Sequence, residues 1–280
     1  VTWVLKGLAG SHHIGKILIN PNNPEEVVVG VTGHLYTTNT ERGIYRSENG
    51  GDTWNQVLYV NDASGIIDMS TVPNNFNIQY AAAWEKDRKA WNFKGNGTSS
   101  GIYKSMDAGK TWTLISTKES GFPTGEGVGR IGLAVYNENT VYAIHDSQFR
   151  RPDGATKKSN GVSKNDFKTM TKEAFLALEN KTLNTFLQEN NFQEKYRAQN
   201  IKNSVRNGLV LPKDLAIYLE DANALLFDTP VVGAEVFKSE NGGATWSKTH
   251  EGYIEDLYYS YGYYFGHIHV APKNADKLYI

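Results

Sequence analysis

The sequence predicts an all-β fold, a β-propeller of four-stranded repeats that carries an α-helical insertion. Three observations predict it. An eight-residue motif occurs three times, apolar strand-like segments with Pro/Asn turns recur between its copies, and the 280 residues include 16 Tyr, 11 Phe, 6 Trp and 27 Gly. Short aromatic strands separated by turn residues are typical of all-β proteins.

The eight-residue motif is a predicted hairpin turn that follows an aromatic strand. Its copies align without gaps over residues 47–54, 105–112 and 239–246. The copies share Ser, Asn or Asp, Gly and Trp, namely Ser47, Asn49, Gly51, Trp54, Ser105, Asp107, Gly109, Trp112, Ser239, Asn241, Gly243 and Trp246. In such a turn the Asn or Asp accepts a backbone N–H from two residues on, Gly supplies positive φ, and Trp covers the neighbouring hairpin. We therefore expect a structural role, in which Trp112→Ala costs about 3–5 kcal/mol of stability if the ring is fully buried.

The spacing of the tryptophans gives the repeat length and locates the insertion. Trp3, Trp54, Trp112 and Trp246 are 51, 58 and 134 residues apart, so the last interval holds one 58-residue repeat and 76 further residues. Four strands in a repeat of this length are typical of a propeller blade. The predicted division is propeller blades at 1–151, a helical insertion at 152–229 and a propeller continuation at 230–280. Because the first and last blades are incomplete and this partial ring would not close, we expect remaining blades of the same chain as structural partners.

The motif and its surroundings resemble a known family. S-x-[DN]-x-G-x-T-W resembles the Asp-box, or bacterial neuraminidase repeat, found in the propellers of sialidases, xyloglucanases and the sortilin family. The wider sequence resembles large bacterial sortilin-like propellers, often labelled glycosyl-hydrolase-like, in segments 13–17, 33–35, 41–45, 83–93 and 219–230. The resemblance implies a binding scaffold for a peptide or glycan, exported to the periplasm, the cell surface or the medium. The alternative is a glycoside hydrolase acting on a polysaccharide, because Asp-boxes stabilise enzymes and binding proteins alike.

The predicted topology separates turns from long loops. Consecutive antiparallel connections alternate between the ends of a sheet, so the loops at 33–42, 84–100 and 145–233 share the end opposite to the motif turns. Long loops on a rigid scaffold tend to carry binding residues. We therefore expect ligand contacts from residues near this loop end, namely His34, Glu41, Arg42, Trp84, Trp91, Arg130 and His267.

These candidates also have structural interpretations. Glu41 and Arg42 suit binding of a ligand carboxylate or acid chemistry, but equally an ion pair between adjacent repeats. Trp84 and Trp91, with Phe93 and the aromatic residues of 258–265, suit either a stacking platform or packing between repeats. Arg130 and Lys16 occupy equivalent positions and are expected to line a central channel. For a hydrolase, the carboxylates near this end are Glu41, Glu85, Asp87 and Asp146, and neither an acid nor a base is assigned.

The helical insertion has its own periodicity. Apolar residues at helical spacing predict a helix that begins after Thr171 as its cap and reaches Leu187, and a more polar helix over 191–206. A third helix is predicted to begin with Pro212 in its first turn. We expect these helices to pack at the loop end, as a lid or as a structural plug.

Composition excludes several function classes. With 29 Lys and Arg against 30 Asp and Glu, the net charge of −1 disfavours a general nucleic-acid binder, and the absence of Cys excludes thiolate zinc sites and disulfides. No apolar run of about 18 residues predicts a membrane span, and no signal peptide is visible in residues 1–20. His12, His13, His267 and His269 lack a third ligand motif, so no metal or cofactor is expected. The Phe-Arg-Ile-Pro signature of sialidases is absent, so sialidase activity is not expected.

Overall fold

The computed structural model describes residues 2–151, 161–190, 192–219, 231–254, 257 and 262–280. It divides into two compact units, Val1–Arg150 with Val231–Ile280, and Arg151–Pro230. Residues 220–230 of the family resemblance, and Tyr258, Tyr259 and Tyr261, lie outside the described residues. None of the described helices is long and apolar enough to cross a membrane.

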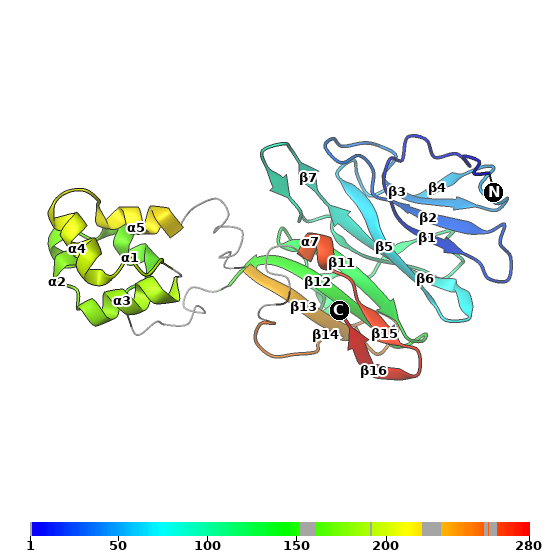
Figure 1. Cartoon of the computed structure of the whole chain (residues 1–280). Coiled ribbons are helices and arrows are strands. Elements are labelled where there is room, and N and C mark those ends of the chain that lie inside the picture. The colour runs from blue at the N-terminus through cyan, green and yellow to red at the C-terminus, as the bar shows by residue number, and fades with distance from the viewer. Residues whose placement is uncertain (1, 152–160, 191, 220–230, 255–256, 258–261) are drawn as a thin grey trace. The chain divides into compact units, whose positions relative to one another are not determined.

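The first unit is built from antiparallel sheets, which confirms the prediction of a mostly β fold (Figure 1). In each four-stranded sheet, neighbours along the chain pair side by side. The first sheet contains β1 (Ile14–Ile19), β2 (Val27–Val31), β3 (Gly43–Ser47) and β4 (Asn55–Leu58). The second contains β5 (Ser64–Val72), β6 (Asn75–Glu85), β9 (Gly101–Ser105) and β10 (Thr113–Leu114). The third contains β11 (Val128–Val135), β12 (Val141–Arg150), β13 (Val231–Ser239) and β14 (Ser247–Lys248).

Shorter elements complete this unit. They are the hairpin of β7 (Asp87–Arg88) and β8 (Phe93–Lys94), the 3₁₀-helix η1 (Lys118–Ser120), the helix α7 (Gly262–Phe265), and the hairpin of β15 (His269–Ala271) and β16 (Asn274–Tyr279). The first strands of successive sheets lie beside one another, β1 next to β5, β5 next to β11 and β11 next to β15. We call these four the inner strands.

Side-chain alternation explains how the sheets pack. Along β6, Tyr80 and Ala82 pack in the core shared with the third sheet, while Ala81 and Ala83 pack in the core shared with the first. Successive side chains of a strand point to opposite faces, so a strand of a central sheet needs apolar residues at both its odd and its even positions. Burial on both faces therefore makes the second sheet the rigid centre of the unit.

The second unit is helical and has its own core. Its helices are α1 (Lys164–Thr169), α2 (Lys172–Ala177), α3 (Asn180–Glu189), α4 (Ala198–Arg206) and α5 (Pro212–Leu219). Thr171 caps α2 by accepting the N–H of Ala174 at 3.2 Å, and Pro212 lies in the first turn of α5, as predicted. The single helix predicted up to Leu187 is wrong, because the chain is extended at Leu178 and Glu179 and restarts as α3. α4 begins at Ala198, seven residues after the predicted start at 191, and α1 was not predicted.

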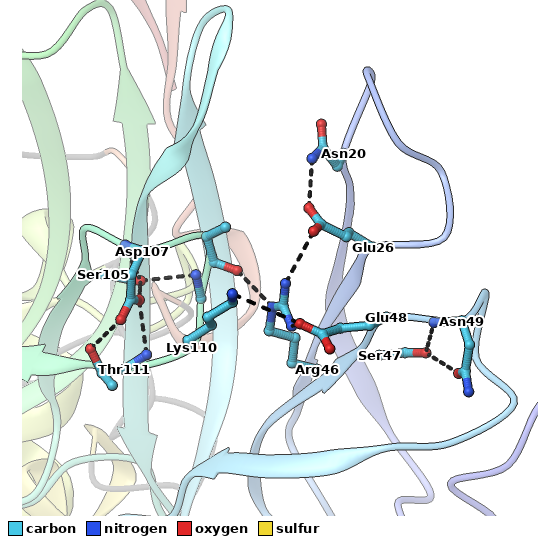
Figure 2. Close-up of polar contacts among 12 residues, drawn as sticks. Asn20, Glu26, Arg46, Ser47, Glu48, Asn49, Ser105, Asp107, Lys110 and Thr111 are labelled. Atoms are coloured by element: carbon cyan, nitrogen blue, oxygen red, sulfur yellow. Dashed lines mark hydrogen bonds and ion pairs between the residues drawn. The ribbon is translucent and has the colours of Figure 1, made fainter.

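The three motif turns connect the third and fourth strands of their sheets and form one hydrogen-bond pattern. In the second sheet, Ser105 Oγ accepts the N–H of Gly109 at 2.9 Å, and Asp107 Oδ1 accepts the N–H of Thr111 at 2.9 Å (Figure 2). The equivalent atoms of the other two turns make the same bonds. The prediction that the Asn or Asp accepts from two residues on is therefore wrong. It accepts from four residues on, and the Ser hydroxyl accepts from the residues two and four on.

A basic residue from one sheet fixes the motif turn of the next. Arg46 Nε donates to the carbonyl of Ala108 at 3.0 Å and pairs with Glu26 and Glu48 (Figure 2). At the equivalent position of the second sheet, Lys104 Nζ donates to the carbonyl of Gly242 at 2.7 Å. These bonds hold adjacent sheets together at the end of the unit that carries the motif turns, which we call the turn end.

The motif tryptophans differ in burial. Trp246 is buried in the core between the second and third sheets, where its ring meets Phe122 edge-on at 5.5 Å. Trp54 and Trp112 are half-buried. The expected cost of 3–5 kcal/mol for full ring burial therefore applies to Trp246 and not to Trp112.

Candidate functional site

The loop end of the first unit is opposite to the motif turns. It receives the loop after β2, the long connection between β6 and β9 with its β7–β8 hairpin, and the ends of β12 and β13, where Arg150 pairs with Val231. Short turns at the other end hydrogen-bond to one another, as Gly50 N does to Glu25 O. The longer connections are therefore gathered at one end of the sheets.

Arg42 is buried and holds the loop after β2 in place. Its side chain is 1% exposed, and it donates to the Asn39 side chain and to the carbonyls of Ala63, His34 and Thr37. Neither of its expected roles fits this geometry. Its donors are engaged within the protein, which leaves little capacity for a ligand carboxylate, and its hydrogen-bond partners are neutral, so it does not form the expected ion pair between adjacent repeats.

The other candidates of this loop also have internal partners. Glu41 accepts a hydrogen bond from the Asn39 side chain at 2.9 Å, which lowers its pKa. His34 bonds to Thr37 Oγ1 at 2.9 Å, and its ring lies 3.9 Å from that of His12. The described residues contain no cluster of three or more His, Cys, Asp or Glu placed to hold a metal ion.

Trp84 and Trp91, which the sequence did not distinguish, have opposite environments. Trp84 is 5% exposed and donates from Nε1 to the carbonyl of Gly95 at 2.7 Å, whereas Trp91 is 85% exposed. Trp84 therefore belongs to the support of the site, and its ring is not a free stacking surface.

A row of aromatic rings extends from Trp84 to the surface. Ring centroids lie 6.2 Å apart from Trp84 to Phe93, 4.6 Å from Phe93 to Tyr263, 5.3 Å from Tyr263 to Tyr264 and 6.0 Å from Tyr264 to Phe265. Tyr264 and Phe265 are 61% and 60% exposed. We call these five residues the aromatic row. It joins the β7–β8 hairpin to α7 and is buried at one end and open at the other.

Arg130 anchors the open end of the row. It donates to the carbonyls of Tyr263 and Tyr264 at 2.9 and 3.0 Å, and its Nη2 lies 2.9 Å from Nε2 of His267. Burial and the charge of Arg130 lower the pKa of His267. In this geometry Arg130 and His267 position α7, whereas the sequence suggested direct ligand contacts.

The inner strands surround a hollow of about 270 Å³, lined in part by Lys16, Asp68, His267 and His269. Asp68 lies 3.6 Å from Lys16 Nζ and accepts the N–H groups of Met69 and Leu133, each at 2.9 Å. Lys16 lines this hollow as predicted for the channel, while Arg130 turns toward α7. Asp68 thus links β1, β5 and β11.

Among the candidate carboxylates, Asp146 is the most deeply buried. It is 1% exposed and accepts one hydrogen bond, from Gln148 at 2.9 Å. Burial raises the pKa of Asp146 to about 7, against the opposing effects of Gln148 and Arg130. Glu85, by contrast, accepts the hydroxyl of Ser99 at 2.6 Å, and Asp87 pairs with Lys89 at 2.8 Å.

Two basic residues of this end were missed by the sequence analysis. Lys86 Nζ lies 5.6 Å from the centroid of the Trp84 ring, and the guanidinium of Arg88 lies 5.3 Å from that of Phe93. The available signal was strand alternation, because Lys86 follows Trp84 by two residues and so shares its face.

Comparisons with known proteins return distant structural neighbours. No protein-family model and no curated protein matches the sequence. The Niastella koreensis GH74 enzyme aligns over 99% of this chain and 30% of its own, at 17% identity and a TM-score of 0.48. The GH74 xyloglucanase from Xanthomonas campestris aligns over 94% of this chain and 34% of its own, at 11% identity and a TM-score of 0.33. The GH93 α-L-arabinofuranosidase of Fusarium graminearum aligns over 47% of this chain and 39% of its own, at 18% identity and a TM-score of 0.30. The chain spans about a third of the length of the GH74 structures.

Proposed function

We propose that the first unit is part of an Asp-box β-propeller, of the sortilin-like kind, and binds a glycan at its loop end. The observation that carries this proposal is the aromatic row with its open end at Tyr264 and Phe265. The apolar faces of sugars stack on exposed aromatic rings, and a large exposed apolar surface on a folded protein marks an interaction site. Trp91 is an additional stacking residue, exposed in the β7–β8 hairpin that also carries Phe93 of the row.

The row is held rigid before any ligand arrives. Trp84 is fixed by its hydrogen bond to Gly95, and the backbone of α7 is fixed by Arg130. A surface ordered in advance loses less conformational entropy on binding, which favours affinity. We include export to the periplasm, cell surface or medium in the proposal, because polysaccharides are encountered there.

A glycan array followed by calorimetry tests this proposal. Tyr264→Ala and Trp91→Ala should each lower the affinity for the oligosaccharide bound best by about tenfold, as expected when a base or sugar ring loses its stacking partner. Tyr279→Ala is the matched control, because Tyr279 is 52% exposed on β16 and outside the row. Unchanged affinity in Tyr264→Ala and Trp91→Ala, or binding to a peptide array alone, would contradict it.

A second candidate is hydrolysis of that glycan, favoured by the environment of Asp146. A carboxyl group with a pKa near 7 is protonated at neutral pH and suits a general acid. Activity should then decline as pH rises through about 7, and Asp146→Asn should abolish it while binding persists. Reducing-sugar release from a polysaccharide panel measures this, and its absence would leave the binding function alone.

A further inference from the structure

The Lys86 side chain is largely buried, and it has no counter-charge among the described residues. Its side chain is 5% exposed, and its Nζ makes neither a hydrogen bond nor an ion pair with any described residue. Nζ makes a cation–π contact with Trp84, 5.6 Å from the centroid of the ring. Burying a charged group in this way is unfavourable unless something else compensates it.

The groups around Lys86 increase that cost. Its backbone N–H and Arg42 Nη1 donate to the same carbonyl, that of Ala63, so the Arg42 guanidinium lies beside the backbone of Lys86. Arg88 adds a second positive charge, and burial, Arg42 and Arg88 together lower the pKa of Lys86 to about 8. Arg88 also makes neither a hydrogen bond nor an ion pair with a described residue, and its guanidinium lies over Phe93.

The nearby carboxylates are engaged elsewhere. Glu85 accepts from Ser99, Asp87 pairs with Lys89 at 2.8 Å, and Asp62 accepts from Tyr59. None of them forms an ion pair with Lys86 or Arg88 among the described residues. The charges that act on Lys86 itself are the positive charges of Arg42 and Arg88.

We propose that Lys86 and Arg88 form a subsite for an oxyanion carried by the glycan, a carboxylate of a uronic acid or a sulfate ester. Their two cations lie beside the rings of Trp84 and Phe93, and the row continues from Phe93 to its exposed end, so a sugar stacked on that end could extend its charged group along the row toward them. Charge-assisted hydrogen bonds to such an oxyanion are stronger than neutral ones. This inference rests on the proposed glycan-binding function and specifies the class of ligand as an acidic polysaccharide.

The experiment measures binding by calorimetry with the 280-residue chain and four probes. The probes are an oligogalacturonate, its methyl ester, a sulfated galactan oligosaccharide and an oligoglutamate. Variants are Lys86→Met, Arg88→Met and the conservative Lys86→Arg. Lys89→Met is the matched control, because Lys89 is on the same connection but is half-exposed and paired with Asp87.

We expect a charged sugar to bind the parent chain at least tenfold more tightly than the methyl ester. Lys86→Met and Arg88→Met should each remove most of that difference, while Lys86→Arg and Lys89→Met keep it. The oligogalacturonate and sulfated arms identify which oxyanion is preferred. Affinity for the charged sugar should decline as pH rises past about 8, where Lys86 loses its proton, and more steeply than in Lys86→Arg.

Several results would overturn the inference. They are equal affinities for the charged and methylated sugars, an unchanged preference in both Lys86→Met and Arg88→Met, and tighter binding of the oligoglutamate than of every sugar. If Lys86→Met unfolds, two other measurements test the subsite. One is the affinity of Arg88→Met for the charged sugar and its methyl ester. The other is acetylation of Lys86 measured by mass spectrometry, which the charged sugar should reduce more than its ester does. Loss of methyl-ester binding in Tyr264→Ala with no effect of Lys86 or Arg88 would retain the proposed function and reject this subsite.

Discussion

Arg46 at the turn end of the first unit and Lys86 at its loop end are two buried basic residues with opposite surroundings. At the turn end, Arg46 is 5% exposed and has two carboxylates and a carbonyl as partners. At the loop end, Lys86 is equally buried and has neither a hydrogen bond nor an ion pair with the described residues. The compensated charge of Arg46 supports the fold, and the uncompensated charge of Lys86 is the feature on which the proposed subsite rests.

The aromatic residues repeat this contrast. At the turn end Trp246 is buried against Phe122, whereas at the loop end the aromatic row opens to solvent at Tyr264 and Phe265. Substitutions of aromatic or basic residues at the turn end should therefore lower stability, and substitutions of the same residue types at the loop end should lower binding.

The largest expected effect is on stability, from Trp246. Trp246→Ala should lower the free energy of unfolding by about 3–5 kcal/mol, because a buried ring is lost. Trp246→Phe should cost less, since the buried Nε1 of Trp246 has no hydrogen-bond partner among the described residues and its removal leaves no new unpaired group. Urea unfolding measures both, with Tyr264→Ala as the comparison that should remain near the parent value. Equal loss of stability in Trp246→Ala and Tyr264→Ala would remove the contrast between the ends.

The next effect compares two arginines. Arg46→Met should cost about 1.5–3 kcal/mol, the value of hydrogen bonds to charged groups, because Ala108 O loses its donor and Glu26 loses its ion pair. Arg88→Met should stay within about 0.5 kcal/mol of the parent, as do surface substitutions that remove no partnered group. The same unfolding experiment measures the pair. A cost for Arg88→Met as large as that for Arg46→Met would mean that Arg88 has a structural role.

Sequence predicted the turn end better than the loop end because the contacts of the two ends span different distances along the chain. The bonds of Ser105, Asp107 and Thr111 all fall within one eight-residue motif, so composition and spacing were sufficient to identify a turn. The acceptor pattern was still wrong, because the choice between residues two and four on depends on backbone conformation. The candidate residues of the loop end were placed near one another, but their roles were not predictable.

Those roles depend on which distant segment meets each side chain. Arg42 is saturated because Ala63, 21 residues away, brings its carbonyl to the guanidinium. Trp84 and Trp91 are separated by the path of the β7–β8 hairpin, which covers one ring and exposes the other. Lys86 differs from Arg42 in having neither a hydrogen bond from its side chain nor an ion pair among the described residues, and no local pattern in the sequence predicts such an absence.

A smaller effect is the pH dependence of the turn end. Partial burial acts to raise the pKa of Asp107, but hydrogen bonds from Thr111 and Ser105 outweigh it and bring the pKa to about 2. A carboxyl with a lowered folded-state pKa stabilises the protein above its unfolded value of 3.8, and this contribution is lost as pH falls toward about 2. Asp107→Asn should therefore flatten the loss of stability between about pH 4 and pH 2, measured as thermal midpoints. Parallel curves for the parent and Asp107→Asn would show that these bonds do not favour the ionised form.

The smallest effect concerns one backbone position within the motif turns. Gly50 and Gly242 have φ of 63° and 66° in the first and third turns, and the second turn has Ala108 at this position with φ of 61°. A left-handed residue other than Gly costs about 1–2 kcal/mol. At position 242, an added Cβ would also lie 2.7 Å from the carbonyl oxygen of Glu138, so Gly242→Ala should destabilise by more than that cost.

Ala108→Gly, the reverse change, should move the free energy of unfolding by less than about 0.5 kcal/mol. The strain relieved is offset by about 0.5–1 kcal/mol of added backbone entropy in the unfolded chain and about 0.8 kcal/mol for the buried methyl group, which is 7% exposed. Because Ala108 O still accepts from Arg46, the link between the first two sheets persists. A loss above about 1 kcal/mol in urea unfolding would show that the methyl group of Ala108 contributes more to the core between these sheets than its size indicates.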